Sequence, residues 1–290
     1  MLKRIFSALK KKGILELVLS RLFKFHAKKV NNYEIYFTNL SRKSGLEVGG
    51  PTRIFRKRSI LPVYPIVADL DGCNFNRTTT WEGKIKEGMT YRYYKNKKGY
   101  QFICDAIELA AIQSKTYDFV LSSHTVEHIA NPFRAISEWL RVLKDNGIIL
   151  LVLPHKDGTF DHNRPITSLN HLIEDFKKNV KEDDLTHLPE ILKLHDLNLD
   201  YAAGNFELLR ERSMNNYKNR CLHHHVFNTE LVIEIFNYFN LQIISVDPVL
   251  PYHIIVMGRK LLSKEMINND TFLGKGTQYA YVSPFPSDKK

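Results

Sequence analysis

The sequence lacks the features that define several large protein classes. Its 290 residues contain only three cysteines, Cys73, Cys104 and Cys221, which are far apart and include no CxxC pair. They predict neither a disulfide framework nor a zinc knuckle, and they are typical of a reducing compartment. No apolar run approaches the roughly 18 to 20 residues that span a bilayer. We therefore expect a cytoplasmic protein that is soluble or bound to a membrane surface.

The chain also has little excess charge outside its first 30 residues. Of the net charge of +11, residues 1–30 carry +8, from nine Lys or Arg and a single acid, Glu16. The other 260 residues therefore carry only +3. Because nucleic-acid binding needs many phosphate contacts, we expect no nucleic-acid partner for the main part of the chain.

Residues 1–30 show the pattern of a basic amphipathic helix. Apolar residues recur mostly at steps of three and four, and Lys and Arg occupy the other faces. Such a helix would bind the anionic inner face of a membrane, or a partner such as a glycosyltransferase. The alternative is a helix that packs its apolar face on the main domain.

Residues 40–260 alternate β-rich runs with helical patterns, which predicts one α/β domain. The expected strands are 45–49, 63–69, 100–105, 117–123, 147–154, 241–247 and 252–258, and the expected helices are 131–143 and 229–239. Near-continuous apolar strands separated by helices indicate a mostly parallel sheet with helices on both faces. Only about four residues join the last two strands, so that pair must be antiparallel. We predict a Rossmann-like seven-stranded sheet with an antiparallel last strand, an α-rich insert at 155–225, and a C-terminal tail at 261–290.

Polar residues follow the predicted strands, at the sheet edge where such folds bind ligands. Glu47, Gly49 and Gly50 follow the first strand, Asp69 and Asp71 the second, Asp105 and Ala106 the third, and Ser123 and His124 the fourth. Three successive acidic strand ends suit a cationic cofactor that carries ribose and an adenine amino group. A single Asp at a strand end is more often a cap or turn residue. No G-x-G-x-x-G motif, which a dinucleotide would require, is present.

Three segments resemble class I S-adenosylmethionine-dependent methyltransferases that act on small molecules: LEVGGP at 46–51, FICDAIEL at 102–109, and YDFVLSSHTVEHIANPFRAISEWLRVLKDNGIILLVLP at 117–154. The resemblance implies that Glu47, Gly49 and Gly50 line the methionine part of the cofactor. It implies that Asp69 or Asp71 binds the ribose and that Asp105 and Ala106 contact the adenine. Ser123 and His124 would lie near the sulfonium. S-adenosylhomocysteine would be the product.

The insert is rich in histidines and acids, and its segments PHKDGTFDHNRPIT, EDDLTHLPEIL and NRCLHHHVFN resemble bacterial methyltransferase-like proteins associated with surface polysaccharides. We therefore expect a sugar hydroxyl of a bacterial glycan as the acceptor. His155 follows the fifth strand and is our first candidate for the base that takes the hydroxyl proton, with His124 second. The candidates for sugar binding are Asp157, Asp161, His162, Arg164 and His225.

Two alternatives remain open from the sequence. A divalent metal would suit the acids and histidines of the insert, but their spacing matches no metal motif, and adjacent histidines in a strand point to opposite faces. A divalent metal is therefore the less favoured alternative. One rival function is a non-catalytic partner in glycan assembly, because Pro51 stands where the resembled family has a second glycine. Another is a methyltransferase of a different small molecule. Cofactor binding separates the non-catalytic function from both methyltransferase functions.

Overall fold

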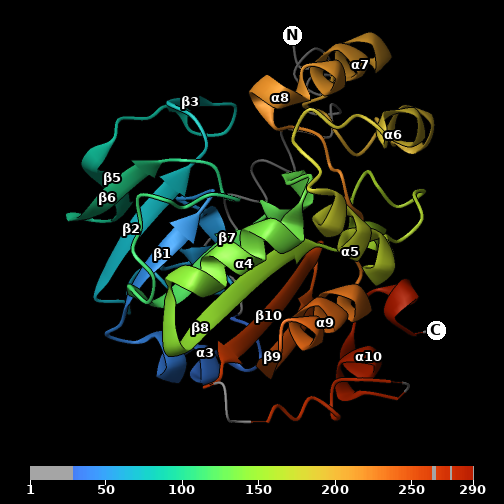
Figure 1. The fold of residues 1–290 in the computed structure, drawn as a ribbon. Coiled ribbons are helices and arrows are strands. Elements are labelled where there is room, and N and C mark those ends of the chain that lie inside the picture. Colours follow the sequence, from blue (N-terminus) through green and yellow to red (C-terminus); the bar gives the residue numbers. More distant parts are fainter. Residues whose placement is uncertain (1–28, 263–265, 275, 290) are drawn as a thin grey trace, which may run out of the picture.

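The computed structural model describes residues 29–262, 266–274 and 276–289. Its centre is an eight-stranded sheet in the order β5-β6-β2-β1-β7-β8-β10-β9 (Figure 1). The strands are β1 (Ser44–Val48), β2 (Asp69–Asn74), β5 (Gly88–Tyr94), β6 (Lys97–Ile103), β7 (Tyr117–Ser123), β8 (Leu143–Pro154), β9 (Leu241–Val249) and β10 (His253–Lys260). The predicted helix at residues 1–30 lies almost wholly outside the described residues.

The sheet is parallel in its middle and antiparallel at both sides. Strands β6, β2, β1, β7 and β8 run parallel, whereas β10 is antiparallel to both β8 and β9. This confirms the predicted Rossmann-like α/β fold and its antiparallel last strand. The eighth strand, β5, was not predicted, and it pairs antiparallel with β6 at the edge of the sheet.

Both faces of the sheet are buried, which explains the near-continuous apolar strands. In β8, Ile149, Leu151 and Leu153 belong to the core that is covered by α4 (Pro132–Val142) and α9 (Thr229–Tyr238). The alternate residues Ile148, Leu150 and Val152 belong to a second core, together with α3 (Tyr33–Leu40). Neighbouring strand residues point to opposite faces, so a strand between two cores must be apolar throughout.

The strand predicted at 63–69 was wrong. β2 begins only at Asp69, and a 3-10 turn (Arg53–Phe55) and irregular backbone occupy the preceding stretch. Pro62 and Pro65 explain the error, because proline cannot donate to the ladder of a central strand. The apolar residues of this stretch, Val63, Tyr64 and Val67, are buried in the second core instead.

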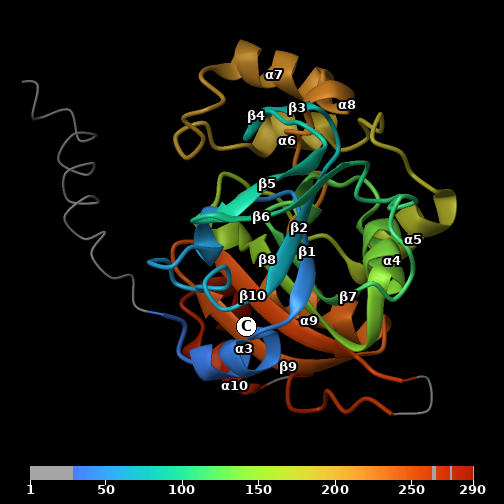
Figure 2. The same cartoon turned by 90° about the vertical axis from the view of Figure 1, so that its left-hand side faces the viewer.

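The insert is mainly helical, as predicted, and it lies beyond the carboxyl ends of the parallel strands (Figures 1 and 2). It contains a 3-10 turn (Lys156–Gly158), α5 (Leu169–Lys178), α6 (Leu188–Leu194), α7 (Phe206–Met214) and α8 (Asn216–Asn219). A small hairpin of β3 (Thr78–Thr79) and β4 (Gly83–Lys84) lies near the insert helices in Figure 2.

The C-terminal segment packs on the domain. It forms α10 (Gln278–Val282) and a 3-10 turn (Pro286–Lys289), and it buries Tyr279, Phe285 and Asp288. In the described part of the chain, no helix is both long and apolar enough to cross a membrane.

Candidate functional site

A pocket lies at the carboxyl ends of β1, β2, β6 and β7, with about 460 Å³ of empty space that includes its open mouth. Its walls come from residues that follow each of these strands and from the insert: Val48, Gly49, Cys73, Asn74, Phe75, Trp81, Cys104, Asp105, Ala106, His124, Thr125, His128, Ile129, Glu182 and Arg220. This is the edge at which parallel α/β sheets bind ligands. Of the predicted cofactor residues, it brings together Gly49, Asp105 and Ala106, with the predicted base His124.

The loop after β1 brings backbone, and not a carboxylate, to the pocket. Gly49 has φ of +85°, and a Cβ atom there would collide with Thr125 Oγ1, so only glycine fits without strain. Glu47 is fully buried beneath the loop, where it accepts hydrogen bonds from Tyr64, Tyr91 and Thr52. Burial raises the pKa of Glu47, and these hydrogen bonds oppose the rise. Neither Glu47 nor Gly50 lines the pocket.

Asp69 and Asp71 lie at the amino end of β2, opposite to the edge predicted for them. Asp71 accepts hydrogen bonds from Tyr117 Oη at 2.7 Å and from the Tyr100 backbone N–H at 2.7 Å, and Asp69 is exposed. The misplaced strand caused this difference, because it set the carboxyl end at residue 69, five residues before the observed end of β2. Asn74 occupies the carboxyl end of β2 and donates to the Gly50 carbonyl oxygen at 2.9 Å.

Two residues of the insert close the pocket beside β6. Arg220 donates to Asp105 at 2.9 Å and forms a 2.7 Å ion pair with Glu182. Glu182 also accepts a hydrogen bond from the Ala130 backbone N–H, and burial raises its pKa to about 7 against the opposing effect of Arg220. Sequence reasoning missed Glu182 and Arg220, because no spacing links them to a strand that is 77 or more residues earlier in the chain.

Strand β7 delivers His124 to the pocket in a left-handed conformation, with φ of +52°. Its Nδ1 atom lies 3.6 Å from Glu127, and its Nε2 atom lies 2.9 Å from His253 Nδ1. Although Glu127 is buried, its pKa is lowered because His124, His128 and His223 surround it. Left-handed backbone at a residue other than glycine is costly and is concentrated at functional sites. Ser123, before it, is buried and does not line the pocket.

His128 is a pocket residue that the sequence analysis did not select. Its Nδ1 atom donates to the Leu222 carbonyl oxygen at 3.1 Å, which leaves the lone pair of the neutral ring on Nε2. Burial lowers the pKa of His128 to about 4, so the ring is neutral at pH 7. Trp81 stacks on it at 6.2 Å between ring centroids.

The structure places His155 away from the pocket. The ring is fully buried and stacks on Phe285, with 3.9 Å between ring centroids. Its Nδ1 atom accepts from the Asp157 backbone N–H at 3.1 Å, and its Nε2 atom contacts Asp288 at 3.1 Å. Both ring nitrogens therefore have partners within the protein, and His124 is the predicted base that the fold brings to the ligand edge.

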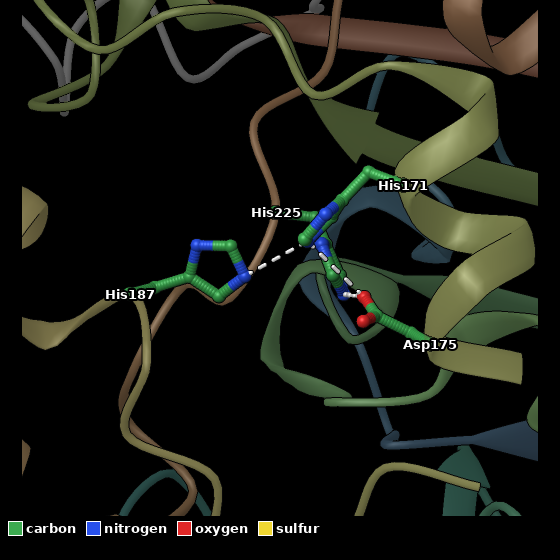
Figure 3. A group of neighbouring side chains, drawn as sticks. All are labelled: His171, Asp175, His187 and His225. Atoms are coloured by element: carbon green, nitrogen blue, oxygen red, sulfur yellow. Dashed lines mark hydrogen bonds and ion pairs between the residues drawn. The ribbon is translucent and has the colours of Figure 1, made fainter. Parts of the chain in front are cut away.

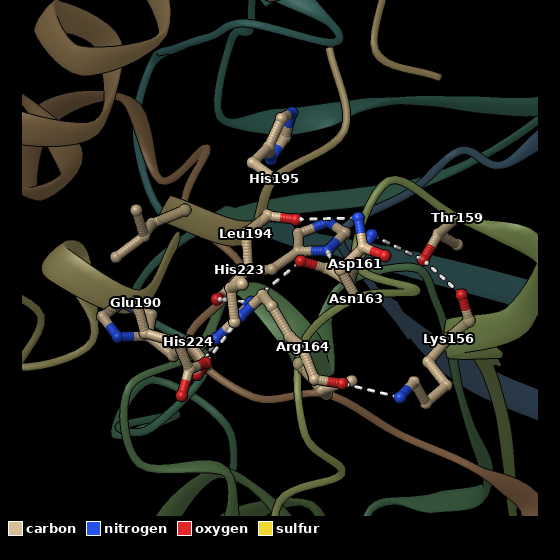
Figure 4. Close-up of polar contacts among 12 residues, drawn as sticks. Lys156, Thr159, Asp161, Asn163, Arg164, Glu190, Leu194, His195, His223 and His224 are labelled. Carbon is tan, nitrogen blue, oxygen red and sulfur yellow. Dashed lines mark hydrogen bonds and ion pairs between the residues drawn. The ribbon is translucent and has the colours of Figure 1, made fainter. Parts of the chain in front are cut away.

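The predicted sugar-binding residues contact one another or other protein groups (Figure 4). Arg164 is 1% exposed and donates to Asp161, Glu190 and two backbone carbonyl oxygens. Asp161 also contacts His223 at 2.6 Å, and these two partners lower its pKa to about 2 despite burial. None of Asp157, Asp161, His162, Arg164 and His225 lines the pocket. Asp157 accepts from the Ser287 backbone N–H, and His162 pairs with Asp196.

Comparisons with known proteins agree with this architecture. Residues 79–151 match the family model of a methyltransferase domain, whereas no curated protein matches the chain. The match and the sheet order support an S-adenosylmethionine-dependent methyltransferase.

Solved structures with this type of fold cover most of the chain at low identity. A methyltransferase from Methanosarcina mazei is 14% identical, covers 79% of this chain and 98% of its own, and has a TM-score of 0.43. One from Aquifex aeolicus is 11% identical, with coverage of 80% and 90% and a TM-score of 0.41. A Rhodobacter sphaeroides protein described as a putative zinc-dependent alcohol dehydrogenase is 12% identical, with coverage of 82% and 92% and a TM-score of 0.46. Likenesses at this level carry no argument about activity.

The pocket fits the cofactor that the family match implies. The Gly49 backbone lines it, and its walls are apolar at Val48, Cys73 and Ile129. Asp105 supplies a carboxylate that can accept from an amino group, and Asn74 supplies an amide at the end of β2. Gly49, Asn74, Asp105 and Ala106 are therefore the residues that would hold S-adenosylmethionine.

Proposed function

We propose that this protein methylates a hydroxyl group of a sugar in a bacterial glycan, with S-adenosylmethionine as the methyl donor. The observation that carries the proposal is the pairing of His124 with buried Glu127 at the edge of the pocket. When bound, the cofactor supplies an electrophilic methyl group. What remains for the protein is to place the hydroxyl and to accept its proton.

His124 is the residue to which we assign that proton. Glu127 lies on the Nδ1 side of the ring, so a proton there puts the lone pair on Nε2, which contacts His253 Nδ1 at 2.9 Å in the structure. The carboxylate then stabilises the imidazolium that forms when Nε2 takes the hydroxyl proton, as an acid does behind a catalytic histidine. The acceptor hydroxyl would replace His253, whose pKa burial lowers to about 3 and which is therefore neutral.

An aromatic surface beside His124 supports a sugar as the acceptor. Trp81 is 41% exposed at the pocket and lies against Phe75 at 5.8 Å and His128 at 6.2 Å between ring centroids. The flat apolar face of a pyranose would pack on these rings, while its hydroxyls would reach the lone pair on His128 Nε2. We further propose that the basic residues 1–30 bind the protein to the anionic inner face of a membrane.

A second candidate function is a non-catalytic partner in glycan assembly. It is favoured by the Arg220–Asp105 ion pair, because an adenine amino group must compete with Arg220 for the same carboxylate. The two functions differ in cofactor binding.

Calorimetry with S-adenosylmethionine and S-adenosylhomocysteine tests the proposal on the full chain. We expect both to bind, with binding weakened tenfold or more by Asp105→Ala and unchanged by Asp69→Ala, a matched control at the opposite end of the sheet. No binding at millimolar concentration would refute the methyltransferase function and leave the non-catalytic partner.

Turnover measurements on the full chain with a glycan acceptor test whether His124 is the base. His124→Gln should lower kcat by about 10² to 10⁴, the usual range for general-base catalysis, and should leave cofactor affinity unchanged. His155→Gln should lower kcat less than tenfold, because that ring faces the tail and not the pocket. A larger loss of kcat in His155→Gln than in His124→Gln would instead identify His155 as the base.

A further inference from the structure

Four side chains of the insert converge on one point, apart from the pocket (Figure 3). They are His171 and Asp175 on α5, His187 just before α6, and His225 in the segment before α9. One nitrogen or carboxylate oxygen from each lies within 4.8 Å of those from the other three. The sequence spacing did not reveal this cluster, because its members are spread over 55 residues and follow no motif.

The separations within the cluster are those of ligands around a tetrahedral metal ion. His171 Nε2 lies 3.1 Å from His187 Nε2 and 3.3 Å from Asp175 Oδ2. Ligands at the usual zinc distance of about 2.0 to 2.1 Å lie about 3.3 Å apart at the corners of a tetrahedron. The two separations at His171 are thus those of ligands to one ion, and each of the four residues offers a ligand atom within 4.8 Å of the others.

Hydrogen bonds alone do not satisfy this cluster. His171 Nε2 faces both His187 Nε2 and Asp175 Oδ2, yet in a neutral ring it carries at most one proton and can donate to only one of them. His225 is 1% exposed, and its Nδ1 atom is buried without a hydrogen-bond partner among the described residues. Its Nε2 atom lies 3.2 Å from the Ala130 carbonyl oxygen. A ring with one nitrogen on a carbonyl and a free lone pair on the other is the usual state of a metal-binding histidine.

We propose that His171, Asp175, His187 and His225 bind one Zn²⁺ ion. Three imidazoles and one carboxylate suit zinc and disfavour Mg²⁺ and Ca²⁺, which prefer all-oxygen ligands. Four protein ligands fill a tetrahedral ion, so the site is structural and leaves no position for a substrate. It differs in this from the group of Glu127, His128 and His223, where His128 Nδ1 and His223 Nδ1 already have partners.

The ion would join three separate segments of the insert to one another. Glu182 lies between Asp175 and His187 in the chain, and Arg220 lies five residues before His225. The site therefore fixes both ends of the segments that carry the Glu182–Arg220 wall of the pocket. This consequence rests on the proposed function, whereas the binding of zinc does not.

Elemental analysis of the full chain, purified through a tag without histidine, tests the site. We expect about one zinc per chain in the wild type and less than a fifth of that in His187→Ala. His162→Ala is the matched control, because it removes another insert histidine that pairs with an acid, Asp196, and it should keep its zinc. Replacement by Co²⁺ should give the visible absorption of a tetrahedral ion in the wild type and in His162→Ala only.

Asp175→Asn is the second variant if His187→Ala does not fold, since it keeps the size of the side chain and removes the charge. It should lower zinc affinity tenfold or more. A wild-type chain that holds no zinc, and whose melting temperature zinc does not raise after chelation, would overturn the proposal. Equal zinc content in His187→Ala or Asp175→Asn and in the wild type would also overturn it. Cofactor calorimetry on the same samples reports separately on the proposed function.

Discussion

Two neutral histidines beside the pocket should make the protein acid-labile at unusually high pH. Burial lowers the pKa of His128 to about 4 and that of His253 to about 3, from an ordinary value of 6.5. Between pH 6.5 and those values the unfolded chain binds protons that the folded chain does not. The free energy of unfolding must therefore fall as the pH falls through this window.

The magnitude follows from the same shifts. Each pKa unit corresponds to about 1.4 kcal/mol, so at pH 5 each histidine costs the folded state about 2 kcal/mol relative to neutral pH. The pair would remove as much as about 4 kcal/mol, a large part of the 5 to 15 kcal/mol that is typical of a domain. Asp161, whose pKa is lowered to about 2, contributes to acid lability only below its ordinary value of 3.8 and does not mask the effect.

Urea denaturation at several pH values between 7.5 and 5.0 measures this loss, and histidine variants identify its source. His128→Asn keeps a donor for the Leu222 carbonyl oxygen, and His253→Gln keeps an amide near His124. Each variant should reduce the slope of unfolding free energy against pH by up to about 1.4 kcal/mol per unit below pH 6, and the double variant by about twice that. Slopes in both single variants equal to that of the wild type would refute the reasoning.

Three further predictions concern the loop, the insert and the N-terminus. Gly49→Ala should lower the free energy of unfolding and weaken cofactor binding more than Gly83→Ala does. Gly83 also has positive φ, but the space around its Cβ position is open. Urea denaturation and calorimetry compare the two variants. Equal effects would show that the contact with Thr125 is unimportant. Arg164→Met should lower the free energy of unfolding, measured by urea denaturation, by about 3 to 5 kcal/mol. The change leaves the Asp161 carboxylate buried beside unpaired carbonyl oxygens. A decrease below 1 kcal/mol would contradict this. Deletion of residues 1–28, which keeps the buried Val30, should release the protein from anionic vesicles in a sedimentation assay. Cofactor affinity should not change. Undiminished vesicle binding would argue against a membrane role for this segment.

The sheet could be predicted because its signals are local. Strands β7, β8, β9 and β10 lie within a few residues of the predicted ranges, since each is a run of apolar residues that two cores bury. The helices at 132–142 and 229–238 begin after Asn131 and Asn228, whose side chains cap them as such residues commonly do. The connection between β9 and β10 is too short for a parallel crossover, so the two strands must run antiparallel.

The edge strand and β2 could not be predicted in the same way. The residues of β5 alternate between exposed and buried with polar side chains among them, which gives no long apolar run. Strand β2 has the sequence DLDGCN, with one strongly apolar residue among acids and a glycine, so the more apolar stretch before it gives the stronger strand pattern. Its place in the middle of the sheet comes from pairing with β1 and β6, which is a tertiary effect.

The surroundings of the histidines could not be predicted from the sequence. His124 and His155 both follow parallel strands at the ligand edge, and the pattern gave no reason to expect different surroundings. They differ through partners that are distant in the chain: His124, which lines the pocket, meets His253, whereas Phe285 and Asp288, 130 or more residues after His155, cover that ring. His171, His187 and His225 likewise meet only because the insert folds back on itself. A histidine's neighbours along the chain thus fix which edge of the sheet it reaches, but the groups that contact its two nitrogens decide whether it can take a proton, bind a metal or do neither.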